Sequence, residues 1–251
     1  MQLPPDIGIQ QRLQKWSNYL ATSVILIALL SLIGWQWNIA LLRDPFSSVV
    51  IMNPVSAIGF ILSVLSMRLF ARNSSGYTAY VLSILVLLIG VLTFISHIFG
   101  FSFQIDTLLF THDIVSDGTA DPGRRMTANT ALCFALIGCC LVFFPGKSKK
   151  QILSQLAVVV VGLLSLLSFL GYLYLVQSFY GLLSFVIMPA STTICFLLFA
   201  LSVLFAVPAK GIMKEITSTL SGSLMFRLLI PATIIIPSAL GLFKNREMPP
   251  S

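Results

Sequence analysis

Three stretches of the sequence share one pattern: MNPVSAIGFILSVLS at residues 52–66, MTANTALCFALIGCC at 126–140 and MPASTTICFLLFALS at 188–202. Each begins with Met, carries Ser or Thr at its fifth position and places Phe at its ninth. A supersecondary unit that recurs in this way buries little apolar surface alone, so its copies must pack together to complete one core. The pattern therefore predicts an internal repeat.

A second pattern precedes each stretch. The segments SLIGW, TFISH and SFLGY end at Trp35, His97 and Tyr172, which places these three rings at equivalent positions. Short connections make consecutive helices antiparallel neighbours, so the repeating unit is predicted to be a two-helix hairpin. We expect three such hairpins, at about residues 19–71, 78–144 and 151–207.

The composition is that of a membrane protein. The 251 residues are 57% hydrophobic and only 9% charged, with a mean hydropathy of +0.97, whereas soluble domains carry about 25% charged residues. The apolar runs are continuous rather than alternating, which favours helices over a transmembrane barrel. A helix needs about 20 apolar residues to cross the hydrocarbon core. Seven runs approach this length, at 17–37, 54–71, 78–99, 126–144, 156–175, 189–207 and 224–243.

These observations predict an all-α membrane protein with seven transmembrane helices, built as three repeated hairpins plus one. The transmembrane domain spans residues 19–243, after an N-terminal segment at 1–18. Between the sixth and seventh spans, residues 210–221 carry apolar side chains at helical spacing with lysines between them, which is typical of a helix lying in the membrane interface.

The positive charges indicate an orientation. Ten of the lysines and arginines fall in the N-terminal segment and in the connections on the same side of the membrane. Only Arg43, Arg124 and Arg125 fall on the other side before the last span. Because cytoplasmic loops carry the excess of Lys and Arg, we expect a cytoplasmic N-terminus.

The tail at residues 244–251 conflicts with this rule. Seven spans from a cytoplasmic start leave Lys244 and Arg246 outside the cell. We therefore expect an eighth span to follow and to return the chain to the cytoplasm. The alternative is that the last segment, which is interrupted by Pro231 and Pro237, does not fully cross.

The hydroxyl residues of the Met-led stretches are candidate ligand contacts. Ser56, Thr130 and Thr192 are equivalent and lie one turn inside the outer membrane face, where they would line a pocket with Asn129. The alternative is helix packing, because small residues allow close approach and an interhelical hydroxyl bond contributes about 0.6–2 kcal/mol.

His97 adds a further candidate, since a histidine within a membrane span is a functional residue by default. Its equivalence to Trp35 and Tyr172 favours instead a place in the interfacial aromatic belt. The candidate ligand-binding residues are thus Ser56, Asn129, Thr130, Thr192, His97 and Tyr172.

The sequence favours neither catalysis nor a cofactor. No nucleophile–base arrangement, phosphate loop or HExxH motif occurs, so we expect no catalytic residue, metal site or cofactor. The four cysteines lie in apolar runs and are interpreted as small buried hydrophobic residues. The basic residues are scattered singly, which argues against nucleic acid as a partner.

Several segments resemble a known kind of membrane region: IDTLLF, GRRMTANTALCFALIGCCLVFF, GYLYLVQSFYGLLSFVIMPASTTICFLLFALSVLFA and SGSLMFRLLIPATIIIPSALGLF. They look like the polytopic region at the N-terminus of bacterial sensor histidine kinases and diguanylate cyclases. The resemblance implies a place in the bacterial inner membrane and a further span leading to a cytoplasmic output domain in cis, which this chain does not contain. His97 departs from the pattern, because an aromatic or small residue is more usual there.

The leading hypothesis is a sensory input module of a signal-transduction protein that is not an enzyme by itself. It would bind a small or lipophilic signal near the extracytoplasmic face and pass the change to the output domain. Its partners would be the lipid bilayer, the unidentified signal, the output domain and a second copy in a homodimer. The alternatives are a structural anchor that localises and dimerises an output domain, or a transporter of small solutes.

Overall fold

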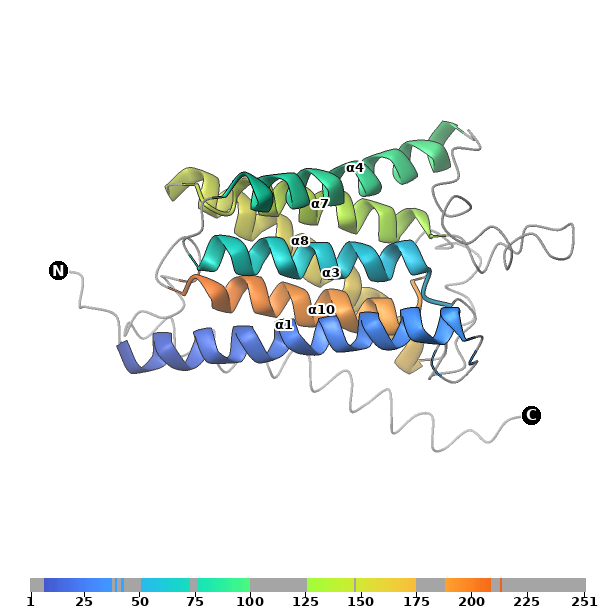
Figure 1. Ribbon diagram of the computed structural model, residues 1–251, viewed down its shortest axis with the longest axis horizontal. Helices are drawn as coiled ribbons and strands as arrows, with labels where there is room; N and C mark the ends of the chain where they lie inside the picture. Colours follow the sequence, from blue (N-terminus) through green and yellow to red (C-terminus); the bar gives the residue numbers. More distant parts are fainter. Residues whose placement is uncertain are drawn as a thin grey trace, which may run out of the picture.

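The computed structural model describes residues 7–37, 39, 42, 51–72, 76–99, 126–146, 148–174, 188–208 and 213. All regular secondary structure in these ranges is helical (Figure 1). The helices are α1 (Ile7–Gln36), α3 (Pro54–Ala71), α4 (Tyr77–Phe99), α7 (Ala128–Phe143), α8 (Ser148–Tyr174) and α10 (Ala190–Ala206).

The helices confirm the predicted all-helical architecture across the described ranges, and their length and apolar composition fit a membrane protein. Four of them, α1, α3, α4 and α8, are long and apolar enough to cross a membrane. The helices α7 and α10 are shorter apolar helices of 16 and 17 residues. The predicted last span at 224–243 and the tail at 244–251 lie outside the described residues, as does the predicted interfacial helix at 210–221 except for Met213.

Two helices begin earlier than the apolar runs predicted. Helix α1 starts at Ile7 rather than at Ser17, and α8 starts at Ser148 rather than at Leu156. The added turns contain Gln, Arg and Lys, which form helix nearly as well as Ala. Hydropathy locates the part of a helix that lies in lipid, whereas the helix itself continues into polar surroundings. Much of the predicted N-terminal segment is therefore the first part of α1.

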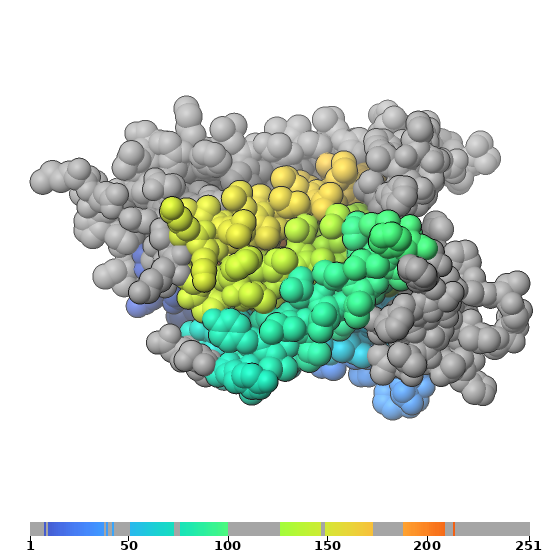
Figure 2. Space-filling view, turned by 90° about the horizontal axis from the view of Figure 1, so that it is seen from above, coloured from blue at the N-terminus to red at the C-terminus, as the bar shows by residue number. Residues whose placement is uncertain are grey.

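The three Met-led helices run in one direction and the other three run in the opposite direction. In Figure 1, α3, α7 and α10 point the same way along the bundle, and α1, α4 and α8 point back. Each of α1, α4 and α8 packs against two Met-led helices: α1 against α3 and α10, α4 against α3 and α7, and α8 against α7 and α10. Figure 2 shows this for one face, where α7 lies between α4 and α8.

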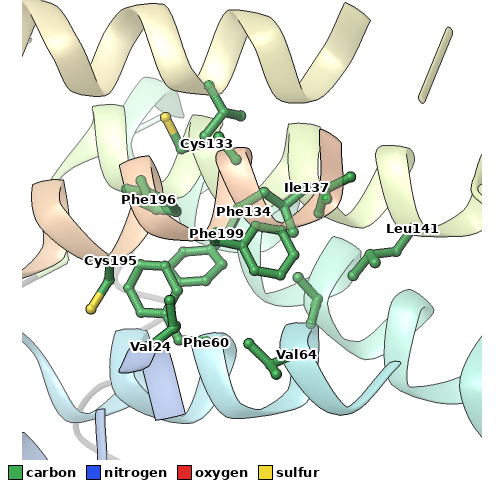
Figure 3. Close-up of a cluster of buried hydrophobic side chains, with 14 of the residues drawn as sticks. Val24, Phe60, Val64, Cys133, Phe134, Ile137, Leu141, Cys195, Phe196 and Phe199 are labelled. Atoms are coloured by element: carbon green, nitrogen blue, oxygen red, sulfur yellow. The ribbon is translucent and has the colours of Figure 1, made fainter. Parts of the chain in front are cut away.

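The Met-led helices meet at the phenylalanines of their ninth position. The rings of Phe60, Phe134 and Phe196 lie in contact with one another, with centroid distances of 4.9 Å, 4.7 Å and 5.0 Å (Figure 3). All three side chains are fully buried, and their tilted and edge-to-face arrangements are those that aromatic pairs prefer. This group, hereafter the Phe triangle, occupies the centre of the bundle. We call α3, α7 and α10 the inner helices and α1, α4 and α8 the outer helices.

One inner and one outer helix approach each other especially closely. A Cβ atom added at Gly90 of α4 would lie 2.7 Å from the carbonyl carbon of Phe134 and 2.8 Å from Cα of Ala135. A Cβ atom added at Gly138 of α7 would lie 2.5 Å from Cα of Leu87. Each glycine thus lies against the backbone of the other helix, the close approach that small residues permit in membrane helices.

Candidate functional site

The inner helices all begin at one end of the bundle, but their caps differ. Asn53 caps α3 by accepting a hydrogen bond from the Val55 amide at 2.7 Å, and Thr127 caps α7 by accepting one from the Thr130 amide at 3.4 Å. Helix α10 has Pro189 at the same position, which supplies no side-chain cap. The sequence had placed Pro189 inside its helix, like Pro54, and this boundary was wrong by one position.

The rings at the end of each outer helix bind the start of the next inner helix. Trp35 Nε1 donates to the carbonyl of Met52 at 2.9 Å. Nε2 of His97 lies 2.7 Å from the carbonyl oxygen of Met126. The hydroxyl of Tyr172 donates to the carbonyl oxygen of Met188. Three different polar rings therefore hold the same backbone position, the residue before each cap.

The three contacts between an outer-helix ring and a methionine carbonyl are hereafter called the joints. Buried hydroxyls lie between these joints and the Phe triangle. Ser56, Thr130 and Thr192 stand four residues before the three phenylalanines, hence one turn nearer the helix start on the same helix faces. All three are almost completely buried, and so are the methionines four residues earlier still. We call Ser56, Thr130 and Thr192 the hydroxyl layer. It lies between a layer of methionines and a layer of phenylalanines.

The members of the hydroxyl layer have different partners. The Thr130 hydroxyl lies 2.9 Å from the Thr127 hydroxyl, so the cap of α7 also pairs with this side chain. The Thr192 Oγ1 atom is buried and has no hydrogen-bond partner among the described residues. Its neighbour Thr193 differs, because its hydroxyl donates to the carbonyl oxygen of Pro189 at 3.1 Å.

The opposite end of the bundle also contains buried polar atoms; several of these pair with one another, although Nε of Arg68 has no hydrogen-bond partner among the described residues. The Ser66 hydroxyl lies 2.8 Å from that of Ser83, and the Cys140 thiol lies 3.2 Å from the Ser154 hydroxyl. The Ser202 hydroxyl donates to the carbonyl oxygen of Ser17 at 2.9 Å. These contacts join each inner helix to an outer one and have the character of helix packing. Cys133, Cys140 and Cys195 are free and buried, as predicted, whereas Cys139 is free but only partly buried, so the prediction was wrong for this residue.

The structure places all six predicted site residues at the end where the inner helices begin. Asn129 is buried in the first turn of α7, beside Thr130. His97 and Tyr172 lie in the last turns of α4 and α8, where their polar ring atoms contact the carbonyls described above. Their binding of a ligand stays a prediction. The sequence analysis missed Trp35 and Pro189 as parts of this region, although the SLIGW segment had already placed Trp35 at the same position as the other two rings.

The region has no metal-binding character within the described ranges, where no group of His, Cys, Asp and Glu is suited to hold an ion. No protein-family model, curated protein or solved structure matches the chain. Its function must therefore be inferred from the geometry of the bundle.

Proposed function

We propose that this chain is the membrane-embedded input module of a bacterial signal-transduction protein. It binds a small or lipophilic signal at the hydroxyl layer, near the extracytoplasmic face of the inner membrane, and relays the change to a cytoplasmic output domain in cis. Its N-terminus is cytoplasmic, and the module is not an enzyme by itself.

We further propose that the module consists of three repeated hairpins and a last span. Three recurring features support the repeat: the ring that binds the methionine carbonyl, the phenylalanine of the Phe triangle, and the small polar residue at the far end of each inner helix. The phenylalanine and the Ser or Cys residue recur at the ninth and fifteenth positions of the quoted pattern, and the ring ends the segment that precedes it. The arrangement of inner and outer helices is also equivalent for the three pairs.

The observation that carries the functional proposal is the burial of the hydroxyl layer. A hydroxyl in an apolar surrounding costs free energy unless it forms a hydrogen bond. A bundle that served only as an anchor would be as stable, or more stable, with apolar residues at these positions. The Thr192 hydroxyl in particular is buried without a described partner. Polar atoms of this kind are the groups that orient a ligand in a mostly apolar site.

The position of the layer also suits a relay. A signal shifts a conformational equilibrium only through a difference in its affinity for the two states. The layer lies one turn from the three joints between outer rings and methionine carbonyls, so a ligand there would act where each hairpin is tied together. A change in these joints would alter how the outer helices pack against the inner ones.

Two alternatives remain as candidate functions. A structural anchor that dimerises an output domain would need only the lipid-facing surfaces of the outer helices, which expose many large apolar side chains. A transporter is disfavoured by the Phe triangle, because three packed rings fill the centre of the bundle where a path would run.

An anchor exchange separates an input module from an anchor. The protein that carries this chain with its output domain is compared with a version in which the chain is replaced by an unrelated multi-pass anchor of the same topology. We expect the output of the native protein to change across growth conditions and that of the exchanged protein to stay constant at equal abundance. An unchanged response after the exchange would contradict the proposal.

A further inference from the structure

Helices α7 and α10 begin with the same spacing but different chemistry. In α7, the hydroxyl oxygen of Thr127 accepts a hydrogen bond from the amide of Thr130, three residues later, and also pairs with the Thr130 hydroxyl. In α10, Pro189 and Thr192 occupy the same two positions, and proline has no side-chain oxygen. The oxygen that pairs with Thr130 thus has no counterpart in the sequence beside Thr192.

The surroundings of Thr192 do not provide a substitute within the described part of the chain. A threonine inside a helix usually donates to the carbonyl four residues earlier, which here is Met188. That carbonyl accepts a hydrogen bond from the Tyr172 hydroxyl, and the Thr192 hydroxyl makes no bond to it. The carbonyl of Pro189 accepts both the amide of Thr193, at 2.9 Å, and its hydroxyl. Thr192 is 0% exposed, so its hydroxyl has no access to bulk water.

We propose that the start of α10 binds a neutral oxygen, a hydroxyl or a carbonyl, of a small amphiphilic molecule. This oxygen accepts from the Thr192 amide and pairs with its hydroxyl, as Thr127 Oγ1 does for Thr130. The inference rests on the proposed function and names the chemistry of the signal. Side chains lean toward the start of their helix, which brings the Thr192 side chain close to the uncapped end of α10.

The surroundings favour a neutral ligand with an apolar body. Met188 and Phe196, one turn before and one turn after Thr192, are fully buried. Methionine adapts its shape to irregular neighbours, and these apolar groups favour a hydrocarbon portion. No Asp, Glu, Lys or Arg lies among the described residues at this end of the bundle. A buried ion without a partner is strongly disfavoured.

Amide hydrogen exchange of the chain in lipid nanodiscs tests the proposal. The probes are 1-hexanol and 2-hexanone, which carry the oxygen, and hexane, which lacks it. Pro189→Thr recreates the pair found in α7 and places the oxygen within the chain. Ser165→Ala is the matched control, since it removes a buried hydroxyl that donates to Val161 within α8, at 2.7 Å.

We expect hexanol or hexanone to slow exchange of the Thr192 amide by about fivefold, the factor that corresponds to a typical helix cap. The effect occurs in the native chain and in Ser165→Ala, and hexane does not produce it. Pro189→Thr exchanges slowly without any probe and does not respond further. The proposal is overturned if all three probes act alike, if no probe acts because water alone pairs with Thr192, or if Pro189→Thr responds like the native chain.

This measurement does not involve the output domain. If hydrogen exchange shows no oxygen-dependent effect at Thr192 but the anchor exchange abolishes the response, the input function is retained and the signal must bind at another site. Binding of the oxygen probes together with an unchanged response after anchor exchange would instead reject the input function and retain the site.

Discussion

Replacing Gly90 with alanine should separate α4 from α7. The added Cβ atom would lie 2.7 Å and 2.8 Å from backbone atoms of Phe134 and Ala135. Backbone atoms have no rotamer to change, so the two helices must move apart for the methyl group to fit. Gly171 of α8 offers a matched control, because a Cβ atom there would meet no heavy atom within 4 Å.

The magnitude follows from two opposing effects. Overpacking a well-filled contact typically costs about 1–3 kcal/mol, and the rigid neighbours place Gly90→Ala near the upper limit of about 3 kcal/mol. Alanine is a better helix former than glycine by about 1 kcal/mol, which offsets part of this cost. We therefore expect Gly90→Ala to lower the free energy of unfolding by about 2 kcal/mol, and Gly171→Ala to raise it by up to about 1 kcal/mol.

Reversible unfolding of the chain in bicelles by added SDS, followed by circular dichroism, measures both variants. Gly138→Ala should behave like Gly90→Ala, since its methyl group would meet Leu87 across the same interface. The double variant should lose less than the sum of the two single losses, because one separation of the helices accommodates both methyl groups. A Gly90→Ala chain as stable as the native one would refute the close approach of α4 and α7.

Further substitutions test the joints, the centre and the orientation. Trp35→Phe removes the donor to the Met52 carbonyl, which should lower the free energy of unfolding by about 1–3 kcal/mol in the same SDS titration; no change would mean that this joint is dispensable. Phe134→Ala removes one ring of the Phe triangle and should cost about 3–5 kcal/mol, which thermal unfolding in detergent detects; a loss near that of an exposed residue would argue against a packed centre. Cysteines introduced at the exposed positions Trp37 and Tyr77 should react with an impermeant maleimide from opposite sides, Trp37→Cys in intact spheroplasts and Tyr77→Cys only in inverted vesicles; the reverse labelling would contradict a cytoplasmic N-terminus.

The sequence predicted the inner helices well because their pattern reflects burial directly. The buried centre of the bundle requires phenylalanine at the ninth position and a hydroxyl at the fifth. These residue types can be recognised directly in the sequence. That Phe60, Phe134 and Phe196 meet one another was not predicted. The pattern states which faces are buried, whereas the choice of inner and outer helices depends on how all the helices pack together.

The joints show a different limit. Trp35, His97 and Tyr172 were recognised as equivalent, and an interfacial aromatic belt was the favoured explanation. Their common partner is a backbone carbonyl, and because every residue has one, the residue types do not reveal which carbonyl a ring contacts. That Pro189 occupies the cap position of α10 was missed for a related reason. Proline suits both the cap position and the first helical turn, and only the backbone decides between them.

Substitution of Thr192 in the protein that carries this chain together with the proposed output domain tests the account most directly. Output is measured, at equal abundance, under the two growth conditions between which the native protein responds most strongly. Thr192→Val removes the hydroxyl with little change in shape, and Thr192→Ser keeps it. Loss of one buried hydrogen bond of about 1.4 kcal/mol corresponds to a roughly tenfold weaker affinity for the signal. The account predicts a strongly reduced response in Thr192→Val and a native-like one in Thr192→Ser. A native-like response in Thr192→Val would contradict it.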